Sequence, residues 1–179
     1  MQLRADIQIT SILKALNDVV LPAIDPGNQL AQEQARLCMG LLDLMSRQLP
    51  LQFRFDVDEL KRLANLGEAL AEAAGVSGST ETVQVDTAYA RDVLNRAQAG
   101  PSEVLAATHA LRASTSALVQ EVCGKAPCQA ITRIERLVLD ASREQLLRDR
   151  SWLLPQRWEP APDAIPAIEA LLAPAQDEA

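Results

Sequence analysis

The stretch from Asp25 to Pro50 constrains the fold of this chain more than any other. Its apolar residues follow the spacing of an α-helix, but they cover two adjoining rows instead of the single stripe of a surface helix. One row contains Leu30, Gln34, Leu37, Leu41, Leu44 and Gln48, and the other contains Ala31, Ala35, Cys38, Leu42, Met45 and Leu49. We therefore expect a central helix that neighbouring helices contact on two sides.

The beginning of this helix has two interpretations. Asp25 is a good N-cap, and Pro26 suits the position after it. Alternatively, Gly27 and Asn28 make residues 25–28 a tight turn, so that the helix begins a few residues later. Gly40 lies on the polar side of the helix, where we interpret it as tolerated and not as a point of close backbone contact.

The whole sequence predicts an all-α fold, an antiparallel bundle of about six main helices. Hydrophobic residues make up 48% of the 179 residues and aromatic residues only 3%, so the core must consist of Leu, Ala, Val and Ile. Such a composition favours helices over a β-sandwich. Besides the central helix, caps, breakers and apolar periodicity predict helices at about 6–21, 56–74, 86–99, 102–123 and 127–150. We expect one domain over residues 1–174 and a disordered tail at 175–179.

Two connections are expected to lack helical structure. Residues 51–55 are predicted to form an extended linker, followed by a capping box at Asp56 and Glu59, with Phe55 packed on Leu60. Residues 75–85 are rich in Gly, Ser and Thr, which predicts a flexible loop and the one boundary between two sub-bundles.

The last part of the chain is rich in proline. From Ser151 onward it contains both tryptophans and five of the ten prolines. We expect an extended segment that lies over the bundle with Trp152 or Trp158 as an anchor. Asp163 is a candidate cap for a last short helix that ends near Leu172.

Charge and cysteine content limit the partners and the compartment. A net charge of -7 argues against nucleic acid and anionic membranes, since both attract clustered cations. No uncharged run approaches the roughly 18 residues that a membrane span needs, and the N-terminus does not resemble a signal peptide. Cys38, Cys123 and Cys128 form no even disulfide framework, which fits a reducing compartment. We expect a soluble, cytoplasmic protein.

The sequence lacks the residue sets of several common chemistries. It has a single histidine, His109, and Ala106 stands three residues before it, which excludes a di-iron carboxylate centre and the usual histidine-rich zinc sites. It contains no dinucleotide-binding, Walker A or nucleophile-elbow motif. Cys123 and Cys128 are spaced C-x4-C, unlike the C-x-x-C of dithiol oxidoreductases, and we interpret them as two unpaired thiols. We predict no metal, no cofactor and no catalytic residue.

Residues 12–49 include the run ILKALNDVVLPAIDPGNQLAQEQARLCMGLL. This run is similar in layout to small bacterial helical domains of unknown function, in which a helix ending V-L-P-A-[IL] turns into a second, alanine-rich helix. Such domains are sometimes encoded beside aminoglycoside-phosphotransferase-like proteins and acyl-CoA dehydrogenases. The resemblance implies no activity and assigns no functional residue.

Three hypotheses for function follow. The first is a non-catalytic interaction or oligomerisation module, in which surplus apolar surface on the helices at 25–50 and 102–123 pairs with a second copy, as a dimer, or with a partner protein. The second is a binding protein for an apolar or acyl small molecule, held in a cavity between the helices at 25–50, 56–74 and 102–123. The candidate ligand-binding residues are Gln34, Gly67, Thr108, His109 and Thr115. The third is an enzyme that uses His109 with a carboxylate from another helix.

Overall fold

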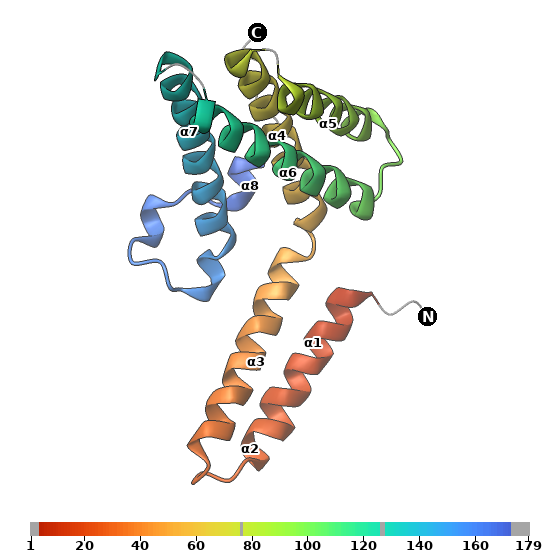
Figure 1. Cartoon of the computed structure of the whole chain (residues 1–179). Coiled ribbons are helices and arrows are strands. Elements are labelled where there is room, and N and C mark those ends of the chain that lie inside the picture. The colour runs from red at the N-terminus through yellow and green to blue at the C-terminus, as the bar shows by residue number, and fades with distance from the viewer. Residues whose placement is uncertain (1–3, 76, 126–127, 173–179) are drawn as a thin grey trace. The chain divides into compact units, whose positions relative to one another are not determined.

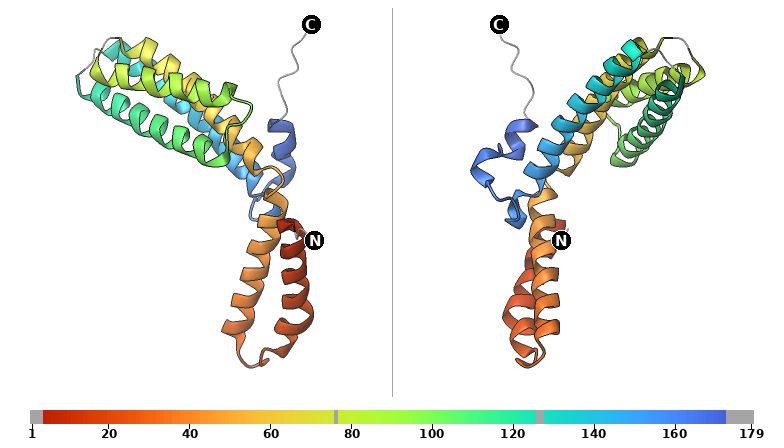
Figure 2. Two further views of the ribbon diagram at one scale, coloured as in Figure 1. Left: turned by 90° about the vertical axis from the view of Figure 1, so that its right-hand side faces the viewer. Right: turned by 60° about the vertical axis from the view of Figure 1, so that its left-hand side comes forward.

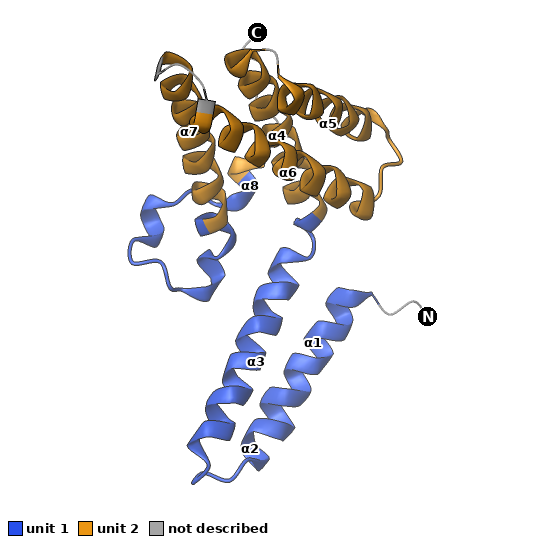
Figure 3. Cartoon of the chain, viewed as in Figure 1, with its two compact units in different colours: residues 1–52, 150–169 blue, residues 53–149, 170–179 orange. Residues whose placement is uncertain are grey.

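The computed structural model describes residues 4–75, 77–125 and 128–172 (Figure 1). Over these ranges the chain is helical, with no β-strand, and six of its helices have at least 11 residues. The predicted all-α bundle fold is confirmed. The chain divides into two compact units (Figure 3): residues 1–52 with 150–169, and residues 53–149 with 170–179. The single domain expected over 1–174 stays a prediction.

The first unit contains a helical hairpin. Helix α1 (Ala5–Ala15) continues through a π-helical turn, η1 (Leu16–Val20), and a short helix α2 (Leu21–Ala23), after which α3 (Gln29–Gln48) returns along α1 (Figure 1). In the connection, the carboxylate of Asp25 accepts a hydrogen bond from the backbone N–H of Gly27 at 2.8 Å. The side chain of Asn28 caps α3 by accepting from the N–H of Ala31 at 3.1 Å. Residues 25–28 thus form the tight turn of the second interpretation, and α3 begins after it.

A proline explains the π-helical turn. The N–H of Leu21 bonds to the carbonyl of Leu16, five residues back instead of four. Pro22 follows directly, and a proline ring collides with the carbonyl four residues before it in a regular α-helix. The π turn upstream of Pro22 is wider than an α turn, so this carbonyl no longer has its regular α-helical position relative to the ring. The π turn contains one residue more than an α turn.

The segment at 150–169 is tied back on itself by polar contacts. Arg150 forms a two-pronged ion pair with Glu159 at 2.7 and 3.0 Å, and the buried hydroxyl of Ser151 donates to the carbonyl of Pro166 at 2.7 Å. The side chain of Gln48 donates to the carbonyl of Trp152 at 3.1 Å. These contacts give the segment a fixed course without long helices.

The segment is less extended than predicted. It contains two 3₁₀ turns, η2 (Leu154–Gln156) and η3 (Pro162–Ala164), and the short helix α8 (Ile168–Leu171). Trp158 is not an anchor, because it is 72% exposed, whereas Ile165 is buried. Asp163 lies inside η3 and does not cap α8, which begins five residues later, after Pro166 and Ala167. The predicted tail at 175–179 lies outside the described residues.

The second unit is an antiparallel bundle of α4 (Gln52–Ala74), α5 (Gly78–Asn95), α6 (Pro101–Lys125) and α7 (Cys128–Trp152), which both views of Figure 2 show packed together. Three cross-links fix the antiparallel pairing of α4 with α7: Asp58 with Arg148, Arg62 with Gln145, and Glu72 with Arg133. The core consists of small and aliphatic side chains, as the composition predicts. Its fully buried members include Leu60, Ala64, Leu70, Val83, Ala90, Ala107, Leu111, Leu118 and Ile134.

The predicted linker at 51–55 is wrong. Helix α4 begins at Gln52, and Phe55 is buried within it, only 7% exposed. Asp56 therefore lies inside the helix instead of at its start, so the predicted capping box with Glu59 is wrong, while Phe55 and Leu60 are both buried. No glycine or proline interrupts residues 51–66, so the backbone has no reason to end a helix there.

The predicted loop at 75–85 is also wrong. Gly75, at a φ of 75°, ends α4, and α5 already begins at Gly78. The hydroxyl of Ser77 caps α5 by accepting from the N–H of Thr80 at 3.2 Å. Because Thr80, Val83 and Thr87 recur on the buried side of α5, this polar stretch packs as a helix. The chain instead passes between the two units after residues 52, 149 and 169.

Candidate functional site

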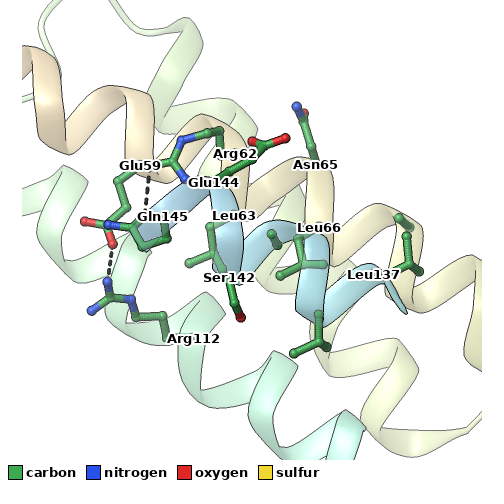
Figure 4. Close-up of a pocket in the computed structure, with 13 residues that line it drawn as sticks. Glu59, Arg62, Leu63, Asn65, Leu66, Arg112, Leu137, Ser142, Glu144 and Gln145 are labelled. Carbon is green, nitrogen blue, oxygen red and sulfur yellow. Dashed lines mark hydrogen bonds and ion pairs between the residues drawn. The ribbon is translucent and has the colours of Figure 1, made fainter. Parts of the chain in front are cut away.

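A groove of about 380 Å³ opens in the second unit between α4, α6 and α7 (Figure 4). Helices α4 and α7 form most of its walls, and α6 contributes one side chain. Its lining consists of Glu59, Arg62, Leu63, Asn65, Leu66, Ala69, Arg112, Leu137, Val138, Ala141, Ser142, Glu144 and Gln145. The volume lies within the range of about 300–1,000 Å³ that is usual for small-molecule sites.

The groove has one charged end and one apolar end. The antiparallel pairing places Arg62 of α4 beside Gln145 of α7, with the side chains joined at 2.8 Å. From this end, the lining becomes aliphatic toward the C-terminus of α4 and toward the N-terminus of α7. The aliphatic side chains include Leu66 on α4 and Leu137 and Val138 on α7. Figure 4 shows Leu137 at the end of the groove opposite Arg112. The apolar side chains there are half-buried and pack against the core of the bundle.

A partly buried ionic network adjoins the charged end. The carboxylate oxygen Oδ2 of Asp58 accepts from Nε of Arg62 and from Nε of Arg148, each at 2.8 Å. The three side chains are only 14–22% exposed. Gln145 extends the network, because its amide accepts from Arg62 and donates to Asp149, also at 2.8 Å. Asp58 thus binds one guanidinium on its own helix and one on α7, and the bond to Arg148 ties α4 to α7.

Arg112 stands at the mouth of the groove. One of its terminal nitrogens, Nη2, pairs with the carboxylate of Glu59 across α6 and α4 (Figure 4). The side chain of Arg112 is 54% exposed, whereas that of Glu59 is 16% exposed. Arg62, by comparison, is 16% exposed and bonds to both Asp58 and Gln145. Of the two arginines that line the groove, Arg112 is much the more exposed.

None of the five residues predicted to bind a ligand lines this groove. Thr108 and Thr115 are buried and donate to carbonyls of their own helix, at Val104 and Leu111, at 2.9 and 2.7 Å. Both hydroxyls are therefore satisfied within α6 itself. His109 lies on the exposed side of α6.

Gly67 and Gln34 lie elsewhere. Gly67 is a point of close helix packing, because a Cβ at this position would be 2.6 Å from the hydroxyl of Thr87 on α5. Gln34 is exposed on α3 and belongs to the first unit. Gly40 has nothing within 4 Å of its added Cβ, which agrees with its interpretation as tolerated. The structure therefore does not assemble the predicted site, and the role of these residues in binding stays a prediction.

The hairpin of the first unit exposes an apolar stripe. Leu30, Leu37, Leu41 and Met45 recur along α3 and are between 46% and 67% exposed. In α1, η1, α2 and α3, only Leu44 is buried. The expectation that neighbours contact this helix on two sides is wrong for the side that carries this stripe, because a two-helix hairpin can cover only one side of each helix.

The remaining findings concern metals, thiols and membranes. Within the described ranges, no group of three or more His, Cys, Asp or Glu side chains is placed to hold a metal ion. Cys38 and Cys123 are free and exposed, and the side chain of Cys128 lies outside the described part. Among the helices described, none combines the length and apolarity of a membrane span.

Comparison with known proteins adds no relative: no family model, curated protein or solved structure matches the chain.

Proposed function

We propose that this chain is a non-catalytic interaction protein of the cytoplasm that self-associates through its N-terminal hairpin. In the proposed dimer, the α1–α3 hairpins of two copies pack face to face as a four-helix bundle. The observation that carries the proposal is the exposed stripe of Leu30, Leu37, Leu41 and Met45 on α3. A contiguous apolar stripe of this kind on a soluble protein marks an interaction surface.

Apolar side chains on α1 and its continuation would extend the same interface. Ile12 is 48% exposed and Val19 is 66% exposed. Complete burial of such a side chain is worth about 1.5–3 kcal/mol, so burying the exposed half gives about 1 kcal/mol. Six such side chains from each copy would contribute about 12 kcal/mol, against about 4–15 kcal/mol lost on association. Because the free energy gained by burial is similar to the free energy lost on association, a stable dimer must bury most of these exposed side chains.

Electrostatics support a second copy as the partner. Residues 4–49 carry Arg4, Lys14, Arg36 and Arg47 against Asp6, Asp18, Asp25, Glu33 and Asp43. The hairpin thus has a net charge of -1, whereas the chain as a whole has -7. Two acidic chains that associate through their least charged segment avoid most of their mutual repulsion. A two-fold symmetric contact also uses the same stripe on both copies.

Size-exclusion chromatography with light scattering on the full chain tests the proposal. We expect the wild type to be a dimer and the double variant Leu37→Glu/Leu41→Glu to be a monomer with unchanged helical content. Val85→Glu is the matched control, because Val85 is 63% exposed on α5 in the second unit, and this variant should remain dimeric. A monomeric wild type, or a Val85→Glu variant that dissociates while the double variant does not, contradicts the proposal.

A further inference from the structure

We propose that the groove between α4, α6 and α7 binds a small amphiphile with an apolar tail and a single carboxylate head. Arg112 would hold the head, and the aliphatic side chains of α4 and α7 would hold the tail. This inference does not depend on dimerisation, because every lining residue belongs to the second unit.

The apolar end of the groove supports the tail. Leu66, Leu137 and Val138 are only half-buried although they continue the core of the bundle. Because water is in contact with apolar surface on both walls here, an aliphatic chain that displaces it gains the free energy of burial on both sides. The α4 residues that line the groove run from Glu59 to Ala69, a span of ten residue steps, which at about 1.5 Å per residue corresponds to about 15 Å.

The charged end supports the head. A guanidinium has five N–H donors in a planar fork, and the structure pairs one nitrogen of Arg112, Nη2, with a described residue, Glu59. Glu59 keeps the guanidinium at the mouth of the groove, while the other donors remain open to a ligand. A carboxylate can take two parallel N–H bonds from such a group. Arg62 is not equivalent, since its Nε and Nη2 already bond to Asp58 and Gln145.

Of the two acidic residues that line the groove, Glu59 is paired with Arg112, but Glu144 favours a ligand of the opposite charge. Glu144 is exposed, and its carboxylate would attract an ammonium head. An ammonium, however, forms a point contact with a carboxylate, whereas the guanidinium of Arg112 offers a carboxylate a matched pair of donors. We therefore assign the head to Arg112, and a cationic amphiphile serves as the direct comparison.

The size of the groove favours a small molecule over a peptide helix. A volume of about 380 Å³ accommodates a ligand of modest size, whereas an α-helix with its side chains is about 10–12 Å across and is far larger for any useful length. An amphiphile with one head and one tail matches the change from charged to aliphatic lining along the groove.

Isothermal titration calorimetry on the full chain tests this assignment, with decanoate, decanol and decyltrimethylammonium as probes below their micelle concentrations. We expect one decanoate per chain, bound about tenfold more tightly than the other two probes, since charge-assisted hydrogen bonds carry the difference. Equal affinity for decanol, tighter binding of the cationic probe, or no binding of decanoate overturns the proposal.

Two pairs of variants locate the binding. Arg112→Gln should weaken decanoate binding about tenfold, whereas Arg133→Gln should not, although Arg133 is equally exposed and also pairs with a glutamate of α4. Ser142→Trp should block the groove, because Ser142 is exposed and lines it. Leu139→Trp, on the exposed side of the same helix, should leave binding unchanged. Circular dichroism verifies that each variant is folded, and an unaffected Arg112→Gln or Ser142→Trp variant would refute the site.

Discussion

Gly67 of α4 and Thr87 of α5 approach so closely that a Cβ on residue 67 would lie 2.6 Å from the Thr87 hydroxyl oxygen. The same Cβ would be 3.3 Å from Leu111 of α6, so three helices converge on this glycine. The Thr87 hydroxyl is buried and has no hydrogen-bond partner among the described residues.

Gly67→Ala should destabilise the bundle by about 1–2 kcal/mol, because the cost of overpacking exceeds the gain in helix propensity. Gly40→Ala is the matched control, since nothing lies within 4 Å of its added Cβ. That variant should gain up to about 1 kcal/mol from helix propensity alone. Urea denaturation followed by circular dichroism measures both, and similar effects of the two substitutions would contradict the close packing at Gly67.

Thr87→Ala should rescue Gly67→Ala. Removing the hydroxyl makes room for the new methyl group and also removes a buried polar atom without a partner. The two substitutions together should therefore cost less than the sum of their separate effects, by about 1 kcal/mol or more. A double-mutant cycle of unfolding free energies gives this coupling, and strictly additive effects would show that the two residues do not meet.

Asp58→Asn should cost about 1–3 kcal/mol, because it leaves Arg62 and Arg148 in a partly buried site without their shared counter-ion. Asp140→Asn is a suitable control. Asp140 also pairs with an arginine, Arg143, but the two side chains are 60% and 77% exposed. Its loss should cost less than about 1 kcal/mol. Chemical denaturation in low and high salt would separate the two, and equal costs would argue against a structural role for Asp58.

Glu103 should make the bundle sensitive to acid. The backbone N–H of Gly100, followed by the guanidinium of Arg96, lowers the pKa of the Glu103 carboxyl through hydrogen bonds of 3.0 and 2.9 Å. Since its pKa is lower in the folded state, Glu103 stabilises the fold above the unfolded-state pKa of about 4.3. This contribution is lost as the pH falls through the folded-state pKa.

Glu103→Gln removes this titration but leaves an oxygen that can accept from Gly100. The variant should therefore be less stable than the wild type at neutral pH, and the difference should shrink as the pH falls below about 4.3. Unfolding free energies across an acid pH series measure the trend. Glu135→Gln, at an exposed position on α7, provides the reference, and a difference that stays constant with pH would be inconsistent with the assigned pKa change.

Thr108→Val and Thr115→Val should each change stability by less than about 1 kcal/mol, because each hydroxyl bonds only within its own helix. Neither variant should alter decanoate binding, since neither residue lines the groove. Calorimetry on the two variants checks this, and a loss of affinity in either would restore the role first expected for these threonines.

The sequence predicted what depends on local spacing. The six main helices and the buried row of α6, from Val104 through Leu111 to Leu118, follow from apolar periodicity. The close packing at Gly67 follows from a glycine placed within an apolar row. Residues 75–85 were misjudged because composition indicated a loop, while a single cap, Ser77, and the burial of Thr80 and Val83 determine a helix.

The groove could not be predicted from spacing alone. Leu63 and Val138 lie on apolar rows with helical spacing, which predict burial, but both are only partly buried. The groove exists because neighbouring helices cover these rows only in part. The extent of this covering depends on how α4, α6 and α7 are arranged in space, which the spacing of residues does not give. Gln34 shows the converse: its row predicted burial, but no helix of the hairpin covers that side of α3.

The π-helical turn before Pro22 also bears on how this chain tolerates a change of length. A π turn contains one more residue than an α turn, so residues 16–20 include one extra residue within an otherwise continuous helix. Deleting one of these five residues together with Pro22→Ala should yield an uninterrupted helix, with its remaining side chains in a common register. Deleting a residue from α1 upstream of this turn would instead rotate the preceding side chains by about 100° relative to α3 and expose Ile9 and Leu13. The hairpin thus has one place where its sequence can shorten and neighbouring places where it cannot.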